Sequence, residues 1–274
     1  MTYRVAQAIR TWTENNTAYM KIIIKENMLE LGKAAGQRAA RLIKAAIEKK
    51  DQASIILATG TSQFETLNQL IKEDIHWSKV NMFHLDEYIG LPESSPACFR
   101  KYLKERFIEK ISALKNVYLI NGEEDAKKEC SRLGEIIKNH VIDVALVGIG
   151  ENGHLGFNDP PADFETDDAF IVVDLDTKCR NQQLGEGWFK SIDEVPKKAI
   201  TMSIKQIMKA NQIICSVPEG RKAMAVKDCF ENAVAKVYPA SVLQKHRGCI
   251  CFLDKYSSGL LTKPMVEVAD SSEM

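Results

Sequence analysis

The chain has 274 residues, of which 45% are apolar and 27% charged, with 15 glycines and 8 prolines. This composition is typical of a globular protein and excludes a collagen-like or low-complexity chain. The 37 basic and 37 acidic side chains cancel. Because binding to nucleic acid requires a surplus of positive charge, we expect no nucleic-acid partner.

Helical patterns and short apolar runs alternate along the sequence. Apolar residues recurring three and four positions apart predict helices, over 30–49, 96–114, 124–140 and 219–230. Apolar runs predict buried strands over 54–58, 80–85, 117–120, 142–147, 169–175, 213–217 and 249–253. Strands that are apolar on both faces and alternate with helices indicate a parallel sheet covered on both sides. We therefore predict an α/β fold, doubly wound and mostly parallel, with helices on both faces in a Rossmann-like arrangement.

Polar segments follow four of these predicted strands. They span residues 59–62, 86–88, 148–154 and 218–222, and each is rich in glycine, hydroxyl or charged side chains. Doubly wound sheets bind their ligands beyond the carboxyl ends of the strands. We therefore expect the functional site to be built from these four segments.

The glycine-rich segment admits two interpretations. Residues 148–153 have the Gly-x-Gly-x-x-Gly spacing of a dinucleotide-binding turn. That turn must open a helix, whereas here Gly156 and a double proline follow and prevent a long one. We prefer the interpretation that glycines such as Gly150 let the backbone approach a small ligand, with His154 and Asp159 presented from the loop. A histidine titrates near neutrality, and Asp159 could fix its tautomer.

Two further segments suit acid–base chemistry and anion binding. Asp86 and Glu87 close a strand, so one carboxylate should face the crevice and the other pack against a neighbouring loop. A carboxylate in the crevice could abstract a proton next to a carbonyl or imine. Thr59-Gly60-Thr61-Ser62 resembles a phosphate cradle, because its glycine lets the backbone approach while hydroxyls and amides donate hydrogen bonds. Lys222 could complete the anion site.

Targeting signals and cysteines limit where the protein can be located and which disulfides or metal sites it can contain. No run approaches the ~18 apolar residues of a membrane-spanning helix, and residues 1–16 lack the apolar centre of a signal peptide. We expect a cytoplasmic protein without a membrane partner. The seven scattered cysteines favour buried thiols over disulfides or a metal site. Residues 1–274 are expected to form a single α/β domain, with a loose start and a loose tail at about 269–274.

At these four segments the sequence resembles the glucosamine-6-phosphate deaminase/isomerase family, over about residues 55–261. The most specific motifs are residues 85–92, 148–160 and 195–202. The resemblance implies that a sugar phosphate is the small-molecule partner. It implies that glucosamine 6-phosphate is isomerised and deaminated to fructose 6-phosphate and ammonia, with Asp86 as the base at C2 and His154 opening the ring. Such an enolisation needs neither a metal nor a redox cofactor.

The resemblance also assigns supporting roles. Asn152 and Asp159 would support His154, and Thr59 to Ser62 with Lys222 would hold the phosphate. Asn152 stands where many members carry Asp, and Asp159 where they carry Glu. The family's arginine before a Phe-Phe pair is missing, and Arg180 could replace its phosphate contact.

Several alternatives stay open. The 6-phosphogluconolactonases share the fold but usually read Asp-Glu-Arg and Asp-Gly-His-Thr, where this chain has Asp-Glu-Tyr at 86–88 and Asn-Gly-His-Leu at 152–155. A non-catalytic sugar-phosphate sensor would tend to lose Asp86 and His154. Galactosamine 6-phosphate is a further candidate substrate, because the choice of epimer depends on one hydroxyl contact. The sequence leaves open whether the protein is a homo-oligomer.

Overall fold

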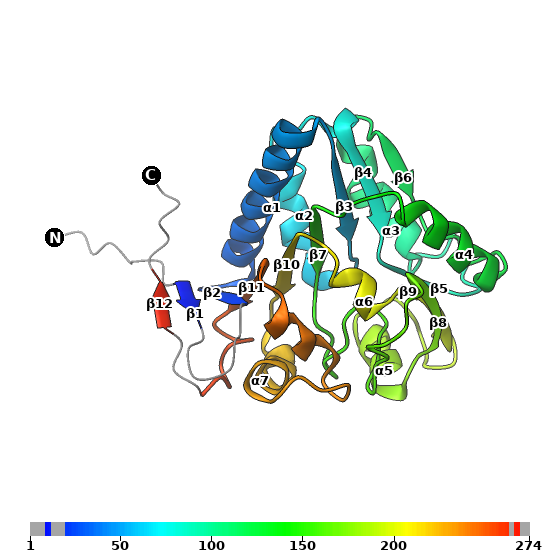
Figure 1. Cartoon of the computed structure of the whole chain (residues 1–274). Helices are drawn as coiled ribbons and strands as arrows, with labels where there is room; N and C mark the ends of the chain where they lie inside the picture. Colours follow the sequence, from blue (N-terminus) through cyan, green and yellow to red (C-terminus); the bar gives the residue numbers. More distant parts are fainter. Residues whose placement is uncertain (1–8, 12–19, 263–265, 269–274) are drawn as a thin grey trace.

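The computed structural model describes residues 9–11, 20–262 and 266–268 and shows one large sheet with helices on both sides (Figure 1). In chain order the strands of this sheet are β1 Ile9–Thr11, β2 Lys21–Lys25, β3 Ala53–Leu57, β4 Val80–His84, β6 Asn116–Tyr118, β7 Val144–Val147, β10 Gln212–Val217, β11 Cys249–Asp254 and β12 Val266–Val268. Their spatial order is β12-β1-β2-β11-β10-β7-β3-β4-β6. From β2 to β6 the strands are parallel, whereas β1 is antiparallel to both of its neighbours.

The strand order reverses between β3 and β7. From β3 the chain proceeds outward through β4 to β6, and from β7 it proceeds in the other direction through β10 to β11. Such a reversal is the point at which doubly wound sheets bind ligands. The predicted doubly wound, mostly parallel fold is confirmed, and the segments 59–62 and 148–154 follow the two strands at the reversal.

The helices are α1 Met28–Lys50, α2 Phe64–Leu70, α3 Phe99–Arg106, α4 Ala126–Ile137, α5 Thr177–Gly185, α6 Ile204–Ile207 and α7 Ala223–Glu231. Most of them pack in two separate cores on the two faces of the sheet, whereas α5 packs in a third, smaller cluster through Cys179. One core joins α1, α2 and α3, through residues such as Ile43 and Leu103, to β3 and β4. The other joins α4, α6 and α7, through residues such as Leu133 and Phe230, to the opposite face. Full burial of an aliphatic or aromatic side chain contributes roughly 1.5–3 kcal/mol, so the two cores fix the sheet from both sides.

A second, antiparallel sheet lies beside the first. Its strands are β5 Asp86–Tyr88, β8 Phe170–Asp174 and β9 Lys198–Met202, in the spatial order β5-β9-β8. The expectation that residues 169–175 join the parallel strands is therefore wrong, because β8 pairs antiparallel with β9 in this separate sheet. Leu85 connects the two sheets: its N–H donates to the Leu57 carbonyl and its carbonyl accepts from Met202. The chain thus leaves the large sheet and enters the small one directly before Asp86.

The helix predicted over 96–114 is shorter than expected. Its start is set by Glu87, whose carboxylate accepts hydrogen bonds from the N–H groups of Phe99 (3.2 Å) and Arg100 (2.7 Å). These amides would otherwise be unpaired at the helix N-terminus. The helix ends at Phe107, where the backbone departs from helical geometry (φ −131°, ψ −63°). The other predicted helices agree with α1, α4 and α7 to within a few residues.

Other expectations concern the cysteines, the membrane and the chain ends. All seven cysteines are free, and six of them are buried, as the sequence predicts. Within the described ranges no helix is both long and apolar enough to cross a membrane. The predicted loose tail at 269–274 lies outside the described residues, as does most of the predicted loose start.

Candidate active site

A cavity opens at the carboxyl ends of β3 and β7. It is partly open to solvent, and small-molecule sites are commonly such clefts with a few convergent polar groups. Seven of the eleven expected site residues line it: Thr59, Gly60, Ser62, Asp86, Gly150, His154 and Lys222. The topology therefore brings the proposed base, the imidazole and the anion-binding groups to one place.

Asp86 begins β5 and its side chain lines the cavity. Only 6% of the residue is exposed. Burial, together with the negative charge of Glu87, raises the pKa of Asp86 to about 8. A hydrogen bond from the Phe157 backbone favours the charged form but does not outweigh these effects. A carboxyl group whose pKa lies near the operating pH is suited to take up and return a proton.

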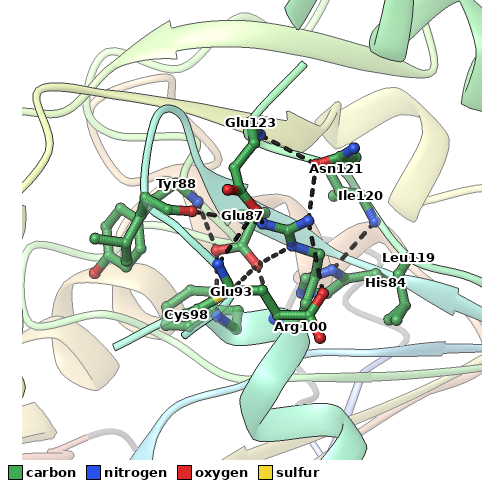
Figure 2. A network of polar contacts seen from close by, with 12 residues as sticks. His84, Glu87, Tyr88, Glu93, Cys98, Arg100, Leu119, Ile120, Asn121 and Glu123 are labelled. Carbon is green, nitrogen blue, oxygen red and sulfur yellow. Dashed lines mark hydrogen bonds and ion pairs between the residues drawn. The ribbon is translucent and has the colours of Figure 1, made fainter. Parts of the chain in front are cut away.

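Glu87, the next residue of β5, faces away from the cavity and has a structural role. Its carboxylate is completely buried and accepts hydrogen bonds from the backbone N–H groups of Tyr88, Phe99 and Arg100 and from the Cys98 thiol (Figure 2). The Arg100 Nε atom lies 3.6 Å from Glu87 Oε2. This network ties β5 to α3 and thereby fixes the strand that presents Asp86.

His154 lies against Gly150, at the other wall of the cavity. A Cβ atom at position 150 would come within 2.2 Å of the imidazole ring, so only glycine leaves room for it. The Nδ1 atom lies 3.2 Å from Asp159 Oδ1, within ion-pair distance, although the ring is not aligned for a hydrogen bond. This arrangement leaves Nε2 available to a ligand.

Asn152 and Asp159 support His154 from behind and do not line the cavity. Asn152 Oδ1 accepts a hydrogen bond from the His154 N–H (3.1 Å), and its Nδ2 donates to Asp159 (3.0 Å) and Asp176 (3.1 Å). Burial opposes ionisation of Asp159, but the contacts with His154, Asn152 and the Asp176 N–H outweigh it and lower the pKa of Asp159. The residue can therefore stay charged and orient the imidazole.

The anion-binding end of the cavity combines the 59–62 segment with Lys222. Gly60 adopts a backbone conformation with φ +90°, which side chains other than glycine rarely adopt. Lys222 is only 2% exposed, and among the described residues no carboxylate lies within ion-pair distance of its ammonium group. Burial and the charge of Arg221 lower the pKa of Lys222 to about 8. A bound anion would supply the charge partner that this buried ammonium lacks.

Two of the expected phosphate contacts lie elsewhere. Thr61 does not line the cavity, and its hydroxyl accepts a hydrogen bond from Arg221 (3.1 Å). The guanidinium of Arg180 donates to the backbone carbonyls of Ile192 and Val195. The expectation that Arg180 replaces the family's phosphate-binding arginine is therefore not supported, because its charge is used to hold the loop that follows α5.

Three polar side chains in the lining were missed by sequence reasoning. They are Gln182, Gln183 and Glu186, which lie on α5 or directly after it. A polar helix without an apolar stripe has the pattern of a solvated surface helix. The one local signal is the pair of adjacent glutamines, and it points to no particular chemistry.

A cluster of potential metal ligands also lies at the site. Donor atoms of His154, Asp159 and Cys179 lie within 4.8 Å of one another. Metal binding by cysteine requires the thiolate. In the protein without an ion, burial and the charges of Asp159 and Asp176 raise the pKa of Cys179 far above its usual range, so that the thiol lies neutral beside the Asp159–His154 pair.

The fold and the cavity define a doubly wound α/β protein with a buried carboxyl, an imidazole and an unpaired ammonium around one small-molecule site. The chain belongs to the family described as glucosamine-6-phosphate isomerases/6-phosphogluconolactonase, whose model matches residues 26–252. The predicted family resemblance is thus confirmed.

Named relatives cover most of the chain. Glucosamine-6-phosphate deaminase of Listeria monocytogenes serovar 1/2a is 35% identical over 243 residues, which span 88% of this chain and 100% of the relative. The deaminase of Lactobacillus delbrueckii subsp. bulgaricus is 33% identical with the same coverage. A solved monomeric glucosamine-6-phosphate deaminase of the NagB superfamily matches with a TM-score of 0.80 and 32% identity, over 88% of this chain and 99% of that one.

A lactonase shares the fold at lower identity. The 6-phosphogluconolactonase of Thermotoga maritima matches with a TM-score of 0.72 but only 15% identity, over 86% of this chain and 100% of that one. This likeness concerns the architecture alone.

Proposed function

We propose that this protein converts glucosamine 6-phosphate to fructose 6-phosphate and ammonia. The observation that carries the proposal is that the Asp86 carboxyl, the His154 imidazole and the Lys222 ammonium line one cavity. An aldose–ketose conversion of an amino sugar phosphate needs a base, a ring-opening proton carrier and an anion anchor. The deaminases among the relatives, at 33–35% identity over 88% of the chain, support this reaction.

Each group has a distinct task in the proposed reaction. Lys222 and the 59–62 segment hold the phosphate, which places the sugar between Asp86 and His154. The imidazole moves a proton from the C1 hydroxyl to the ring oxygen, which opens the ring. Asp86 then takes the proton from C2 and returns it to C1, while a proton of the amine nitrogen passes to O1. The C1 aldehyde thus becomes an alcohol and the C2 amine becomes an imine. Water adds to this imine and ammonia leaves, which makes the overall reaction a hydrolysis.

The positioning residues act through the imidazole. Asp159 stabilises the protonated ring, and Asn152 holds Asp159 in place while it accepts from the His154 backbone N–H. Neither side chain touches the cavity, so we expect both to affect the rate more than the binding of substrate.

The test compares three substrates with the purified protein. Ammonia release is measured from glucosamine 6-phosphate and from galactosamine 6-phosphate, and loss of the lactone is measured with 6-phosphogluconolactone. We expect ammonia from an amino sugar phosphate, and no turnover in Asp86→Asn. Hydrolysis of the lactone alone would make the protein a lactonase. Binding of sugar phosphates without turnover of any of the three would make it a sensor.

A further inference from the structure

The Glu186 carboxylate lies in the cavity with one oxygen unpaired. Its side chain is only 5% exposed. The Oε1 atom accepts a hydrogen bond from Gln182 (3.0 Å) and lies 3.6 Å from Arg221 Nη1. The Oε2 atom is buried and has no hydrogen-bond partner among the described residues. Because an unpaired buried carboxylate oxygen is costly, a ligand that brings a donor would relieve it.

The neighbouring hydroxyl groups donate their hydrogens elsewhere. Tyr88 donates to Gln183 Oε1 (2.8 Å), and Tyr102 donates to the Gly60 carbonyl (3.1 Å). Burial and, in addition, the negative charge of Glu186 raise the pKa of each phenol. Both phenols therefore lie near the Glu186 carboxylate. The protein itself therefore leaves the Oε2 atom to a ligand.

The unpaired oxygen lies at the anion-binding end of the cavity. Glu186 Oε2 is 3.8 Å from the position that a Cβ atom would take on Gly60. Lys222 lines the same cavity. A phosphate held by the 59–62 segment and the Lys222 ammonium would thus come next to a carboxylate.

The charges around this end disfavour a phosphate dianion. Lys222 is the one lysine or arginine among the described residues that line the cavity, and the nearby Arg221 already pairs with Glu151 (2.8 Å) and Glu219 as well as with Glu186. The Lys222 ammonium is thus accompanied in the lining by the Glu186 carboxylate before any ligand binds. A monoanion adds one negative charge fewer than a dianion and also brings an O–H donor.

We propose that the cavity binds the phosphate of its substrate as a monoanion, with one proton shared between a phosphate oxygen and Glu186 Oε2. This inference rests on the proposed function, because it takes the ligand to be a sugar phosphate. The second pKa of a phosphate monoester is about 6, so the free ligand is mostly a dianion at neutral pH. Binding then takes up one proton from solvent, and no covalent bond other than O–H changes.

Proton uptake on binding tests the proposal without turnover. The full chain is titrated calorimetrically with glucitol 6-phosphate, an open-chain sugar phosphate that has no carbonyl group, in buffers of different ionisation enthalpy. Lys222, with a pKa of about 8, is mostly protonated at neutral pH and can add only ~0.1 proton there. We expect uptake close to one proton at neutral pH, and a Kd that rises on the order of tenfold from about pH 6 to about pH 7.5.

Two matched variants locate the proton. Glu186→Gln replaces the carboxylate by an amide, whose NH₂ group can donate a hydrogen bond to a phosphate dianion. Proton uptake on binding should therefore fall to ~0.2 or less. The change of Kd between about pH 6 and about pH 7.5 should fall to roughly threefold or less. Glu151→Gln also removes a carboxylate from Arg221, but Glu151 does not line this cavity. This control should retain the uptake of the unmodified protein.

Other results of these titrations would contradict either the monoanion proposal or the proposed function. If the unmodified protein binds glucitol 6-phosphate without proton uptake, Glu186 accepts from a sugar hydroxyl and the inference is wrong. Equal uptake by the unmodified protein and Glu186→Gln would place the proton on another group, with the same consequence. Failure to bind glucitol 6-phosphate anywhere between acidic and mildly alkaline pH would instead remove the proposed function itself.

Discussion

The imidazole of His154 lies so close to Gly150 that a methyl group on that glycine would come within 2.2 Å of the ring. Gly150→Ala must therefore displace the imidazole from its position next to Asp159. We expect kcat to fall by roughly 10²-fold, because general acid–base catalysis contributes about that much or more. Gly134→Ala on α4 is the control, since nothing lies within 4 Å of a Cβ atom there. That variant should retain full activity.

Asp86→Asn removes the proposed base and leaves the shape of the cavity. We expect exchange of the C2 proton with solvent to fall by ~10³-fold or more, while the Kd for the sugar phosphate changes little. In the reverse direction the same proton is taken from C1, so exchange is followed by incorporation of deuterium at C1 of fructose 6-phosphate incubated with ammonia in heavy water. Unchanged exchange in this variant would remove Asp86 from the proposed role.

The same substitution should stabilise the protein at alkaline pH. Folding raises the pKa of Asp86 from 3.8 to about 8, so the folded state favours the neutral carboxyl. This contribution is fully present below the unfolded pKa and is lost as the pH rises through about 8. Asparagine is neutral throughout. In thermal unfolding we therefore expect Asp86→Asn to melt above the unmodified protein at alkaline pH, and the two to agree at acidic pH. A lower melting temperature at alkaline pH would contradict the burial argument.

Asn152→Asp restores the residue that many family members carry, yet we expect it to slow this enzyme. Asn152 Nδ2 donates to both Asp159 and Asp176. A carboxylate in its place would bring three negative groups together and would disfavour the ionised Asp159 that orients His154. We expect kcat to fall about tenfold, less than the ~10²-fold expected when the acid–base group itself is displaced, because His154 stays in place. Steady-state kinetics on both proteins measure it, and an equal or higher kcat would contradict the prediction.

Lys222→Gln and Arg180→Gln separate two basic residues that the sequence alone could not rank. Lys222 lines the cavity without an ion-pair partner, whereas Arg180 donates to backbone carbonyls. We expect Lys222→Gln to raise KM by at least roughly tenfold, since a charge-assisted contact contributes ~1.5–3 kcal/mol. Arg180→Gln should leave KM unchanged and lower the melting temperature. A large rise of KM in Arg180→Gln would restore the phosphate contact expected from the sequence.

The parallel sheet could be predicted because its strands are buried on both faces and therefore read as continuous apolar runs, as in Ile55 and Ile56 of β3. The second sheet could not, because β5 has only three residues and the antiparallel pairing of β8 with β9 is long-range. In β9, residues 198–202 carry no pattern that separates an antiparallel strand from a loop. Tertiary contacts decide such segments.

The site was predictable where a polar segment follows a buried strand, as Asp86 after β4 and His154 after β7 show. Glu186 lacks such a signal, because it follows a polar helix and enters the cavity only through the packing of that helix. Arg180 shows the opposite failure: its charge suggested a ligand, but nearby carbonyls bind it. Helix-borne polar residues need the three-dimensional arrangement before a role can be assigned.

Neighbouring positions on β5 point to opposite faces, Asp86 toward the cavity and Glu87 toward the start of α3. Deletion of one residue near Leu85 would place Glu87 at the cavity position of Asp86 and Tyr88 at the position of Glu87. The longer side chain would then enter the cavity, and the amides of Phe99 and Arg100 would lose their acceptor. Spacing at this junction therefore matters as much as the identity of the acid, and a homologue with a gap at this point should have lost both its chemistry and the beginning of a helix.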